Sequence, residues 1–243
     1  VTLTADAGVC GAGSVDLGIP ETADNCGIDA EDIINDAPTI FPVGETTVTW
    51  TVTDINGNST TATQLVTITD DEPPMITPPA DAEVSSEEGV CGISAEHIGT
   101  PETSDNCEVE SVENDAPDIL PIGISFINWI VTDIHGNTST AIQIITVNDT
   151  EAPQITTPTP VEVSADEGVC EAAEVDLGTL EATDNCESLN IENDAPPSFP
   201  VGQTTVTWTV TDNSGNSATA TQLVTVTDDE APAITAPANV NAT

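Results

Sequence analysis

The stretch TTVTWTVTD, residues 204–212, alternates threonine with apolar residues. It places Val206, Trp208 and Val210 on one face and threonine on the other, which is the period of a half-buried strand. The NSGN that follows is typical of a hairpin turn, because glycine and asparagine tolerate a positive φ. The return strand is SATATQLVTVTD, residues 217–228. This hairpin predicts a β fold.

The same hairpin occurs three times at a nearly constant spacing. Trp50, Trp129 and Trp208 are 79 residues apart in both steps, and the motifs GVC, DNC and TDxxGN recur with them. An internal repeat of this length indicates tandem copies of one domain. The predicted domains are a first repeat at 1–72 that lacks its first strand, a second repeat at 73–151, a third repeat at 152–230, and the first strand of a fourth repeat at 231–243.

Each repeat contains several short strands separated by turns and shows no helical periodicity. This pattern predicts an all-β chain of tandem β-sandwiches. Val1, Ala82, Val161 and Val240 occupy equivalent positions, so the chain begins and ends at the same point of the repeat. We therefore expect it to be a slice of a longer array. No stretch approaches the ~20 apolar residues of a membrane span, so no membrane insertion is expected in this segment.

The charge of the chain is extreme. It has 43 Asp and Glu residues, no Lys or Arg, and a formal net charge of −43. Phosphate groups are bound by Lys and Arg, so nucleic acids and anionic membranes are excluded as partners. An acidic chain with few aromatics is also compatible with disorder. The hydrophobic content of 37% and the strand periodicity argue against disorder, and cations are the expected partners.

The six cysteines fall two per repeat, always 16 positions apart. Even, regularly spaced cysteines in an extracellular chain indicate disulfides. Buried free thiols are the alternative, whereas the absence of CxxC and of clustered histidine disfavours zinc. A catalytic cysteine is disfavoured because no histidine recurs beside it, and His97 and His135 are interpreted as incidental. The predicted disulfides are local: Cys10–Cys26, Cys91–Cys107 and Cys170–Cys186.

Acidic residues cluster where each repeat ends, in DDEPP from Asp70, DTEAP from Asp149 and DDEAP from Asp228. Like charges at this density need a counterion, and Ca²⁺ takes about six to eight oxygen ligands. In an immunoglobulin-type sandwich the chain leaves the domain facing two loops of the next one. Here those loops carry DNC and TDxxGN, so we predict Ca²⁺ between neighbouring repeats. The alternative is that the acids are solvated residues that cap their own turns.

The predicted Ca²⁺ ligands form three groups, one for each linker. They are Asp70, Asp71 and Glu72 with Asp105 and Asp133; Asp149 and Glu151 with Asp184 and Asp212; and Asp228, Asp229 and Glu230. Asn137 and Asn216 are candidate further ligands. Ions held in this way would stiffen the string of repeats.

The quoted motifs resemble the hyalin repeat (HYR) family. Its pattern of G-x-C, D-N-C, F-P-x-G-x-T-x-V-x-W/Y and D-x-x-G-N is matched by GVC, DNC and FPVGETTVTWTVTDINGN. The second repeat departs from it, with LPIGISFINWIVTDIHGN. The resemblance implies tandem immunoglobulin-like β-sandwich repeats, forming an extended rod, and roles in extracellular adhesion. The absence of Lys and Arg resembles giant bacterial surface adhesins, including the filamentous adhesins of gliding bacteria.

No nucleophile–base set and no phosphate-binding loop is visible, so the segment is predicted not to be an enzyme. The favoured function is that of stalk or filament repeats in a large extracellular cell-surface adhesin, rigidified by Ca²⁺ and by one disulfide per repeat. The alternatives are a module that binds a glycan or protein directly, and a spacer attached to a secreted enzyme. The expected partners are Ca²⁺, neighbouring repeats of the same chain, surface glycans or proteins, and laterally associated copies.

Overall fold

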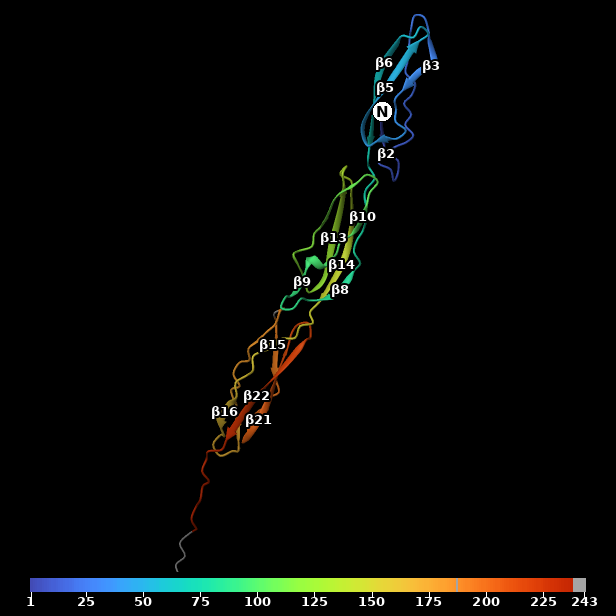
Figure 1. Cartoon of the computed structure of the whole chain (residues 1–243). Coiled ribbons are helices and arrows are strands. Elements are labelled where there is room, and N and C mark those ends of the chain that lie inside the picture. Colours follow the sequence, from blue (N-terminus) through green and yellow to red (C-terminus); the bar gives the residue numbers. More distant parts are fainter. Residues whose placement is uncertain (187, 238–243) are drawn as a thin grey trace, which may run out of the picture. The chain divides into compact units, whose positions relative to one another are not determined.

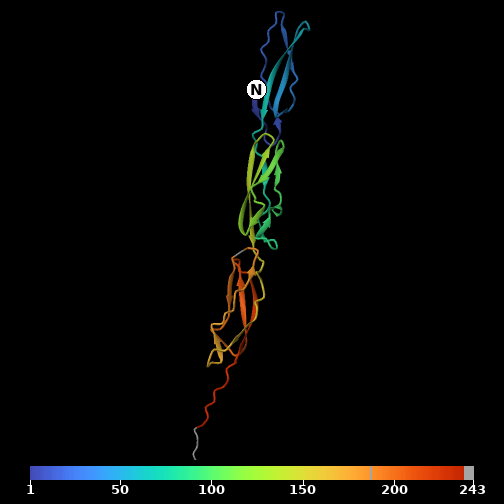
Figure 2. The same cartoon turned by 90° about the vertical axis from the view of Figure 1, so that its left-hand side faces the viewer.

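The alternating stretch at residues 204–212 forms a strand, as predicted. A computed structural model describes residues 1–186 and 188–237, with the backbone alone at 29–31. In it β21 (Gly202–Thr211) pairs antiparallel with β22 (Ser217–Thr227). The two strands lie side by side in both views (Figure 1 and Figure 2). The predicted inward face of β21 is confirmed, because Val206, Trp208 and Val210 are all buried.

The chain divides into two compact units. Unit 1 comprises Val1–Ala82, Ala95–Asp118 and Ser125–Ile145, and unit 2 comprises Glu83–Ser94, Ile119–Ile124 and Thr146–Thr243. Among the described residues the one helical element is the 3-10 turn η1 (Ala95–His97). The all-β fold class is therefore confirmed. The repeat boundaries and the extended rod stay predictions, and Val240 of the predicted fourth repeat lies outside the described residues.

Unit 1 is built on a four-stranded sheet in the order β1-β6-β5-β3. β5 and β6 form its antiparallel hairpin, and β1 joins β6 in parallel, with Leu3 opposite Ile68. Two small antiparallel pairs, β2 with β4 and β7 with β10, accompany it, and β11 pairs with β13. The strands are β1 (Thr2–Thr4), β2 (Gly11–Ala12), β3 (Ile28–Asn35), β4 (Phe41–Pro42), β5 (Gly44–Asp54), β6 (Ser59–Thr69), β7 (Met75–Thr77), β10 (Glu102–Ser104) and β11 (Val109–Asn114), with most of β13 (Gly123–Asp133) and β14 (Thr138–Asn148).

Unit 2 repeats this plan with a sheet in the order β16-β22-β21-β19. β16 again joins the hairpin in parallel, with Val161 opposite Val224. The small antiparallel pairs are β9 with β12, β15 with β18 and β17 with β20. The remaining strands are β8 (Ala82–Ser85), β9 (Gly92–Ser94), β12 (Ile119–Pro121), β15 (Gln154–Ile155), β16 (Val161–Ser164), β17 (Glu171–Ala173), β18 (Ala182–Thr183), β19 (Asn190–Asn193) and β20 (Ser198–Pro200).

In each unit an apolar core lies between the four-stranded sheet and a two-stranded pair. In unit 2, Ala172 of β17 and Phe199 of β20 pack with Val206, Trp208 and Val224 of the large sheet. In unit 1, an equivalent cluster joins the pair β2–β4 to β5 and β6. Two facing layers with one apolar interior form a β-sandwich, the architecture that the short strands predict.

A glutamine is hydrogen-bonded to each tryptophan, and this feature was not predicted. Gln222 is 2% exposed, and its Oε1 accepts the indole N–H of Trp208 at 3.0 Å. Its Nε2 donates to the carbonyl oxygens of Thr159 and Leu177, at 2.8 and 2.9 Å. Each Trp–Gln pair thus ties the hairpin to loops outside the sheet. The equivalent pairs are Trp50 with Gln64 and Trp129 with Gln143.

The TDxxGN motif builds the turn of each hairpin. In the third repeat, Oδ1 of Asp212 accepts the backbone N–H of Asn216 at 2.8 Å, and Oδ2 accepts its side-chain N–H at 2.8 Å. Gly215 takes a φ of 93°, a conformation that glycine adopts without strain. The turn is therefore closed around one carboxylate, at the end of the sandwich where that carboxylate can meet a linker.

Candidate functional site

The first two linkers each begin with an aspartate that the fold buries. Asp70 directly follows β6 and is 9% exposed, and Asp149 directly follows β14 and is 7% exposed. Oδ1 of each accepts the backbone N–H of the glutamate two residues on, at 3.3 Å for Glu72 and 3.1 Å for Glu151. This local hydrogen bond turns the chain at the strand end and fixes the carboxylate.

The linker glutamates bind the loop that carries GVC. Oε2 of Glu72 accepts the backbone N–H of Gly8 at 2.7 Å, and Oε2 of Glu151 accepts that of Gly89 at 2.8 Å. A carboxylate is a strong acceptor for a backbone N–H. These two glutamates, predicted as metal ligands, therefore hold the GVC loop beside the linker.

We give the name junction 1 to the cluster of Asp70, Asp105, Asn106, Asp133 and Asn137, all in unit 1. One carboxylate oxygen from each of the three aspartates lies within 4.8 Å of the others. Asn106 Nδ2 donates to Oδ1 of Asp70 at 3.1 Å, and Asn137 Nδ2 donates to its backbone oxygen at 3.3 Å. The structure thus brings the DNC loop, the TDxxGN turn and the linker together, as predicted from the sequence.

Asp133 is the most deeply buried acid of junction 1, with no exposed surface. Burial by itself would raise its pKa, because desolvation disfavours the charged form. Hydrogen bonds from the Asn137 side chain and from the backbone N–H groups of Asn137 and His135 outweigh this and hold the pKa of Asp133 below its ordinary value. Asp133 is therefore a carboxylate anion at neutral pH.

Two buried oxygens of junction 1 have no hydrogen-bond partner among the described residues, Oδ1 of Asp105 and Oδ1 of Asn106. An unpaired buried polar group costs about 1–3 kcal/mol. The cluster therefore offers carboxylate and amide oxygens with unused lone pairs in a strongly negative setting. This is the donor chemistry that Ca²⁺ takes, so the residues present fit that ion.

Junction 2, formed by Asp149, Asp184, Asn185, Asp212 and Asn216 of unit 2, repeats this arrangement. Asn185 Nδ2 donates to Oδ1 of Asp149 at 3.4 Å, and Asn216 Nδ2 donates to its backbone oxygen at 3.2 Å. Oxygens of Asp149 and Asp184 lie within 4.8 Å of each other, and Asp212 is connected to the linker through Asn216. The buried unpaired oxygens are again Oδ1 of the DNC-motif residues Asp184 and Asn185.

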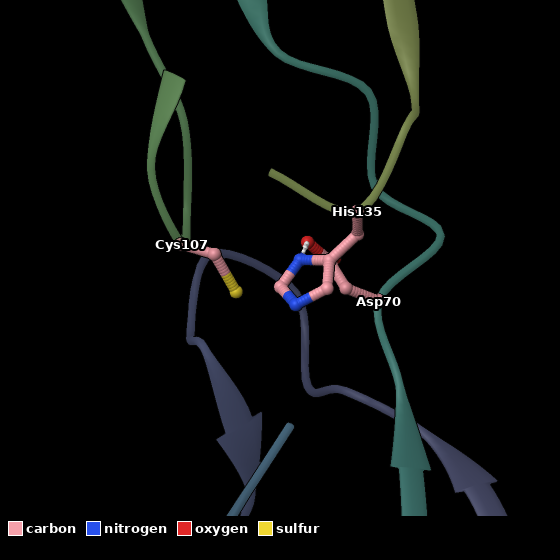
Figure 3. Close-up of side chains that lie close together, drawn as sticks. All are labelled: Asp70, Cys107 and His135. Carbon is pink, nitrogen blue, oxygen red and sulfur yellow. Dashed lines mark hydrogen bonds and ion pairs between the residues drawn. The ribbon is translucent and has the colours of Figure 1, made fainter. Parts of the chain in front are cut away.

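The two junctions differ at one position. His135 Nδ1 lies 3.0 Å from Oδ2 of Asp70 (Figure 3), whereas in junction 2 the Ser214 hydroxyl lies 3.4 Å from Oδ2 of Asp149. The interpretation of His135 as incidental is therefore wrong, because its place in the TDxxGN turn brings the ring to the linker aspartate. Figure 3 also shows the sulfur of Cys107 pointing toward this site, but that sulfur is bound in a disulfide.

The structure leaves six of the predicted ligands outside both junctions: Glu72 and Glu151, which bind the GVC loops, and four exposed acids. Asp71 is exposed, and so are the three acids of the last linker. Of these, Asp228 accepts the backbone N–H of Glu230 at 3.1 Å, and Asp229 accepts the Ser164 hydroxyl at 3.0 Å. Metal binding by any of the predicted ligands stays a prediction.

The predicted pairing of cysteines within each repeat is wrong. The bonds instead connect the GVC loop of one repeat to the DNC loop of the next, over sequence separations of 97 and 95 residues. The disulfides are Cys10–Cys107, in unit 1, and Cys91–Cys186, in unit 2. Cys26 and Cys170 are free and exposed.

The first repeat shows why local pairing fails. Cys10 lies beside β2, which pairs with β4 just before β5 begins. Cys26 lies at the other end of β5, where the N–H of Ile55 donates to the carbonyl of Gly27. β5 has 11 residues, and such a strand spans roughly 35 Å. The Cα atoms of a disulfide must lie within about 7 Å, so the two cysteines of one repeat cannot meet.

Asn106 and Asn185 are functional residues that were not predicted from the sequence. Each donates across its junction to the linker aspartate and also to a carbonyl of the GVC loop, Val9 at 3.4 Å and Val90 at 3.2 Å. The signal was present, because asparagine stands in DNC in all three repeats. The aspartate and the cysteine on either side of it were interpreted as a metal ligand and a disulfide partner, and no role was assigned to the asparagine.

Comparison with known proteins finds relatives of these repeats. Residues 148–226 match the HYR domain. Hyalin of Lytechinus variegatus is 33% identical in an alignment of 220 positions that covers 81% of this chain and 40% of that protein. Hyalin of Strongylocentrotus purpuratus is 33% identical in an alignment of 214 positions that covers 82% of this chain and 18% of that protein. The chain thus spans less than half the length of either hyalin.

Among solved structures, Drosophila N-cadherin EC1-4 aligns with a TM-score of 0.39 and 12% identity, over 78% of this chain and 59% of that one. The described residues contain no helix with the length and apolar character that crossing a bilayer requires. The family match at 148–226 falls on motifs that recur in the first and second repeats, and the hyalin matches extend over most of the chain. The chain is therefore built of HYR-like repeats.

Proposed function

We propose that these repeats form the stalk of a large extracellular adhesion protein at the cell surface. In this proposal the repeats carry no catalytic activity. Ca²⁺ held at junctions 1 and 2 stiffens the string of repeats into a rod, and the disulfides fasten each repeat to the next. The giant adhesins of bacteria, including the filamentous adhesins of gliding cells, are the class that the Lys-free and Arg-free composition favours.

The observation that carries the proposal is the set of unpaired buried oxygens at both junctions. Oδ1 of Asp105 and of Asp184 are buried without a hydrogen-bond partner in the described chain, beside the linker aspartates Asp70 and Asp149. A cation between these carboxylates would satisfy the free oxygens and neutralise charges that otherwise repel. Solvated turn residues, the alternative interpretation of these acids, would not be buried in this way.

Calcium is expected to raise the melting temperature of the chain. A ligand that binds only the folded state at about 100 times its Kd stabilises it by about 2.7 kcal/mol per site. Extracellular calcium modules bind with Kd values of about 10⁻⁴–10⁻³ M, so millimolar Ca²⁺ covers the useful range. The measurement is thermal unfolding by circular dichroism in CaCl₂ and in chelator at fixed ionic strength, with the maximum dimension of the chain followed by small-angle scattering.

A matched pair of variants separates junction calcium from calcium bound elsewhere. Asp105→Asn with Asp184→Asn removes one carboxylate from each junction and should abolish most of the calcium response. Asp24→Asn changes the same position of the DNC motif in the first repeat, where the aspartate is exposed and faces no linker among the described residues, and should leave the response intact. Equal melting temperatures and dimensions with and without Ca²⁺ would overturn the calcium model.

Direct binding of a partner protein is a second candidate function, favoured by an exposed apolar strip on the second repeat. Phe126 and Ile130 of β13 are 63% and 41% exposed, and Ile142 of β14 is 57% exposed. The other two repeats have threonine at all three equivalent positions. Phe126 and Ile130 share the outward face of β13 with Asn128 between them, and exposed apolar residues grouped on one face are typical of contact surfaces.

Changing this strip to the threonines of the other repeats tests the second candidate. The triple variant Phe126→Thr, Ile130→Thr and Ile142→Thr should keep its circular dichroism spectrum and melting temperature, because these side chains are largely outside the core. Sedimentation velocity of both proteins over a concentration series then measures lateral self-association. Loss of association in the variant supports the strip as a contact surface, and identical sedimentation argues for the stalk function alone.

A further inference from the structure

Junction 1 contains an imidazole where junction 2 contains a hydroxyl. The residue before the glycine of the TDxxGN turn is His135 in the second repeat and Ser214 in the third. Imidazole nitrogen suits Zn²⁺, Cu²⁺ and Ni²⁺, whereas carboxylates, carbonyls and water suit Ca²⁺ and Mg²⁺. We propose that junction 1 binds a divalent transition metal of the Zn²⁺ class through His135, Asp70 and Asp105, and that junction 2 takes oxygen-preferring cations alone. This inference rests on the proposed function in one respect, that cations occupy the junctions.

His135 and Asp70 are placed as two neighbouring ligands of one metal. Nδ1 of His135 lies 3.0 Å from Oδ2 of Asp70, and the two side chains face each other in Figure 3. Two ligands that bind one Zn²⁺ at about 2.0–2.2 Å are roughly 3–3.5 Å apart. The Asp70 side chain has no exposed surface, whereas the His135 side chain is 27% exposed. A metal at this point would be held by a buried carboxylate and reached from solvent on the imidazole side.

Asp70 is oriented by its other oxygen. Oδ1 accepts the backbone N–H of Glu72 at 3.3 Å and the side-chain N–H of Asn106 at 3.1 Å. These hydrogen bonds fix the carboxylate so that Oδ2 faces His135. Ligating carboxylates in metal sites are commonly held in this way, by hydrogen bonds that set their direction.

Asp105 supplies the third ligand. Its Oδ2 accepts the backbone N–H groups of Cys107 and Glu108, at 2.8 and 3.1 Å. Its Oδ1 is buried and has no hydrogen-bond partner in the part of the chain that the structure describes. One oxygen of Asp105 lies within 4.8 Å of one oxygen of Asp70. The chain has no Lys or Arg to offer Oδ1 a positive charge, and a metal ion bound beside it would do so.

Asp133 positions the imidazole. Its Oδ1 accepts the backbone N–H groups of His135 and Asn137, at 2.8 and 2.9 Å, and its Oδ2 accepts the Asn137 side chain at 2.8 Å. Both oxygens therefore hold the turn that presents His135. The disulfide Cys10–Cys107 likewise fixes the DNC loop that presents Asp105, and its sulfur is not a thiolate ligand. Three ligands on braced loops leave room for water to complete the coordination.

Junction 2 has the same carboxylates without the nitrogen. Oδ1 of Asp184 is again buried and unpaired among the described residues, and the group that faces Oδ2 of Asp149 is the Ser214 hydroxyl, at 3.4 Å. A hydroxyl oxygen is a harder donor than an imidazole nitrogen, and Zn²⁺ prefers nitrogen and sulfur. One change of side chain therefore gives the two junctions different metal preferences.

The test is Zn²⁺ binding to the whole chain in calcium-free buffer at physiological ionic strength. Isothermal titration calorimetry should show one tight site, above the weak binding of exposed carboxylates. His135→Ser gives the turn the residue of the third repeat and should weaken this site by about 100-fold, because loss of a group that merely supports a ligand already costs about 10–100-fold. Ser214→His should add a second tight site.

His97→Ser is the matched control, since His97 is the other of the two histidines of the chain and is exposed. This variant should bind Zn²⁺ with the wild-type affinity. With two histidines in the chain, the ring C–H signals in an NMR spectrum are assigned from the two single variants. Zn²⁺ should shift the ring signals of His135 and leave those of His97 unchanged.

The outcomes separate this inference from the calcium model. Equal Zn²⁺ affinity in the wild-type chain and in His135→Ser, or a shift of the His97 signals alone, would overturn the inference. A melting temperature that rises in CaCl₂ would then still support calcium at the junctions. Tight Zn²⁺ binding that depends on His135 would support the inference, even where Ca²⁺ leaves the melting temperature unchanged.

Discussion

Removing the disulfide between Cys10 and Cys107 is expected to lower the free energy of unfolding by about 4–5 kcal/mol, a large share of the stability of a typical domain. The bond closes a loop over a sequence separation of 97 residues. In the chain-entropy description, a loop of this length removes many conformations from the unfolded state and few from the folded one. The measurement is urea-induced unfolding of Cys10→Ser with Cys107→Ser, followed by circular dichroism.

The free cysteines supply a matched control for this experiment. Cys26→Ser with Cys170→Ser makes the same chemical change at the same number of positions, but both residues are free and exposed. This control should unfold within about 0.5 kcal/mol of the wild-type chain. If the two double variants had the same unfolding midpoint, the disulfide between Cys10 and Cys107 would contribute nothing to the free energy of unfolding.

Replacing Gln222 by leucine should destabilise the third repeat by about 3–5 kcal/mol, because several buried groups lose their partners at once. The Trp208 indole N–H would lose its acceptor, and the carbonyl oxygens of Thr159 and Leu177 would lose their donor. Leucine has a similar volume and is more apolar, so hydrophobic burial alone would predict the opposite sign. Differential scanning calorimetry of the variant measures the change.

Gln203→Leu is the control for this substitution. Gln203 lies on the neighbouring strand β21 and is exposed, so the same chemical change should shift the stability by no more than about 0.5 kcal/mol. A Gln222→Leu variant as stable as this control would show that the Trp–Gln pair is dispensable and that packing alone holds the hairpin.

The strands were predictable because the alternation of residues that specifies each strand lies within the strand itself. The alternation in TTVTWTVTD places Trp208 inward, and the same alternation in the return strand places Gln222 on the face of Val224 and Val226. The burial of Trp208 was predicted from the first signal, whereas that of Gln222 was missed because glutamine is usually a surface residue. A polar residue in phase with core positions predicts a buried hydrogen bond.

The junctions were partly predictable. The linker acids and the DNC loop were expected to meet, and Asp70, Asp105 and Asp133 do come together. The cysteine partners were missed because tandem repeats offer two regular spacings, 16 residues within a repeat and 97 or 95 residues between repeats. Asp105 was predicted to lie at the junction with the first linker, and Cys107 is two residues away, so it must lie at the same junction. This placement already favoured cysteine pairing between repeats over pairing within one repeat.

The two disulfides also determine how the chain would carry mechanical load. Their loops, 10–107 and 91–186, overlap, so the shortest covalent path between the ends of the chain runs through residues 1–10, 91–107 and 186–243. Tension applied at the termini therefore bypasses the β5–β6 hairpin and most of the second and third repeats up to Cys186. At roughly 3.4 Å per residue, several hundred ångströms of backbone would stay out of reach of a stretching force, even if the sandwiches melted. The β21–β22 hairpin stays in the load path, so the chain would yield there by a fixed length and then hold on covalent bonds.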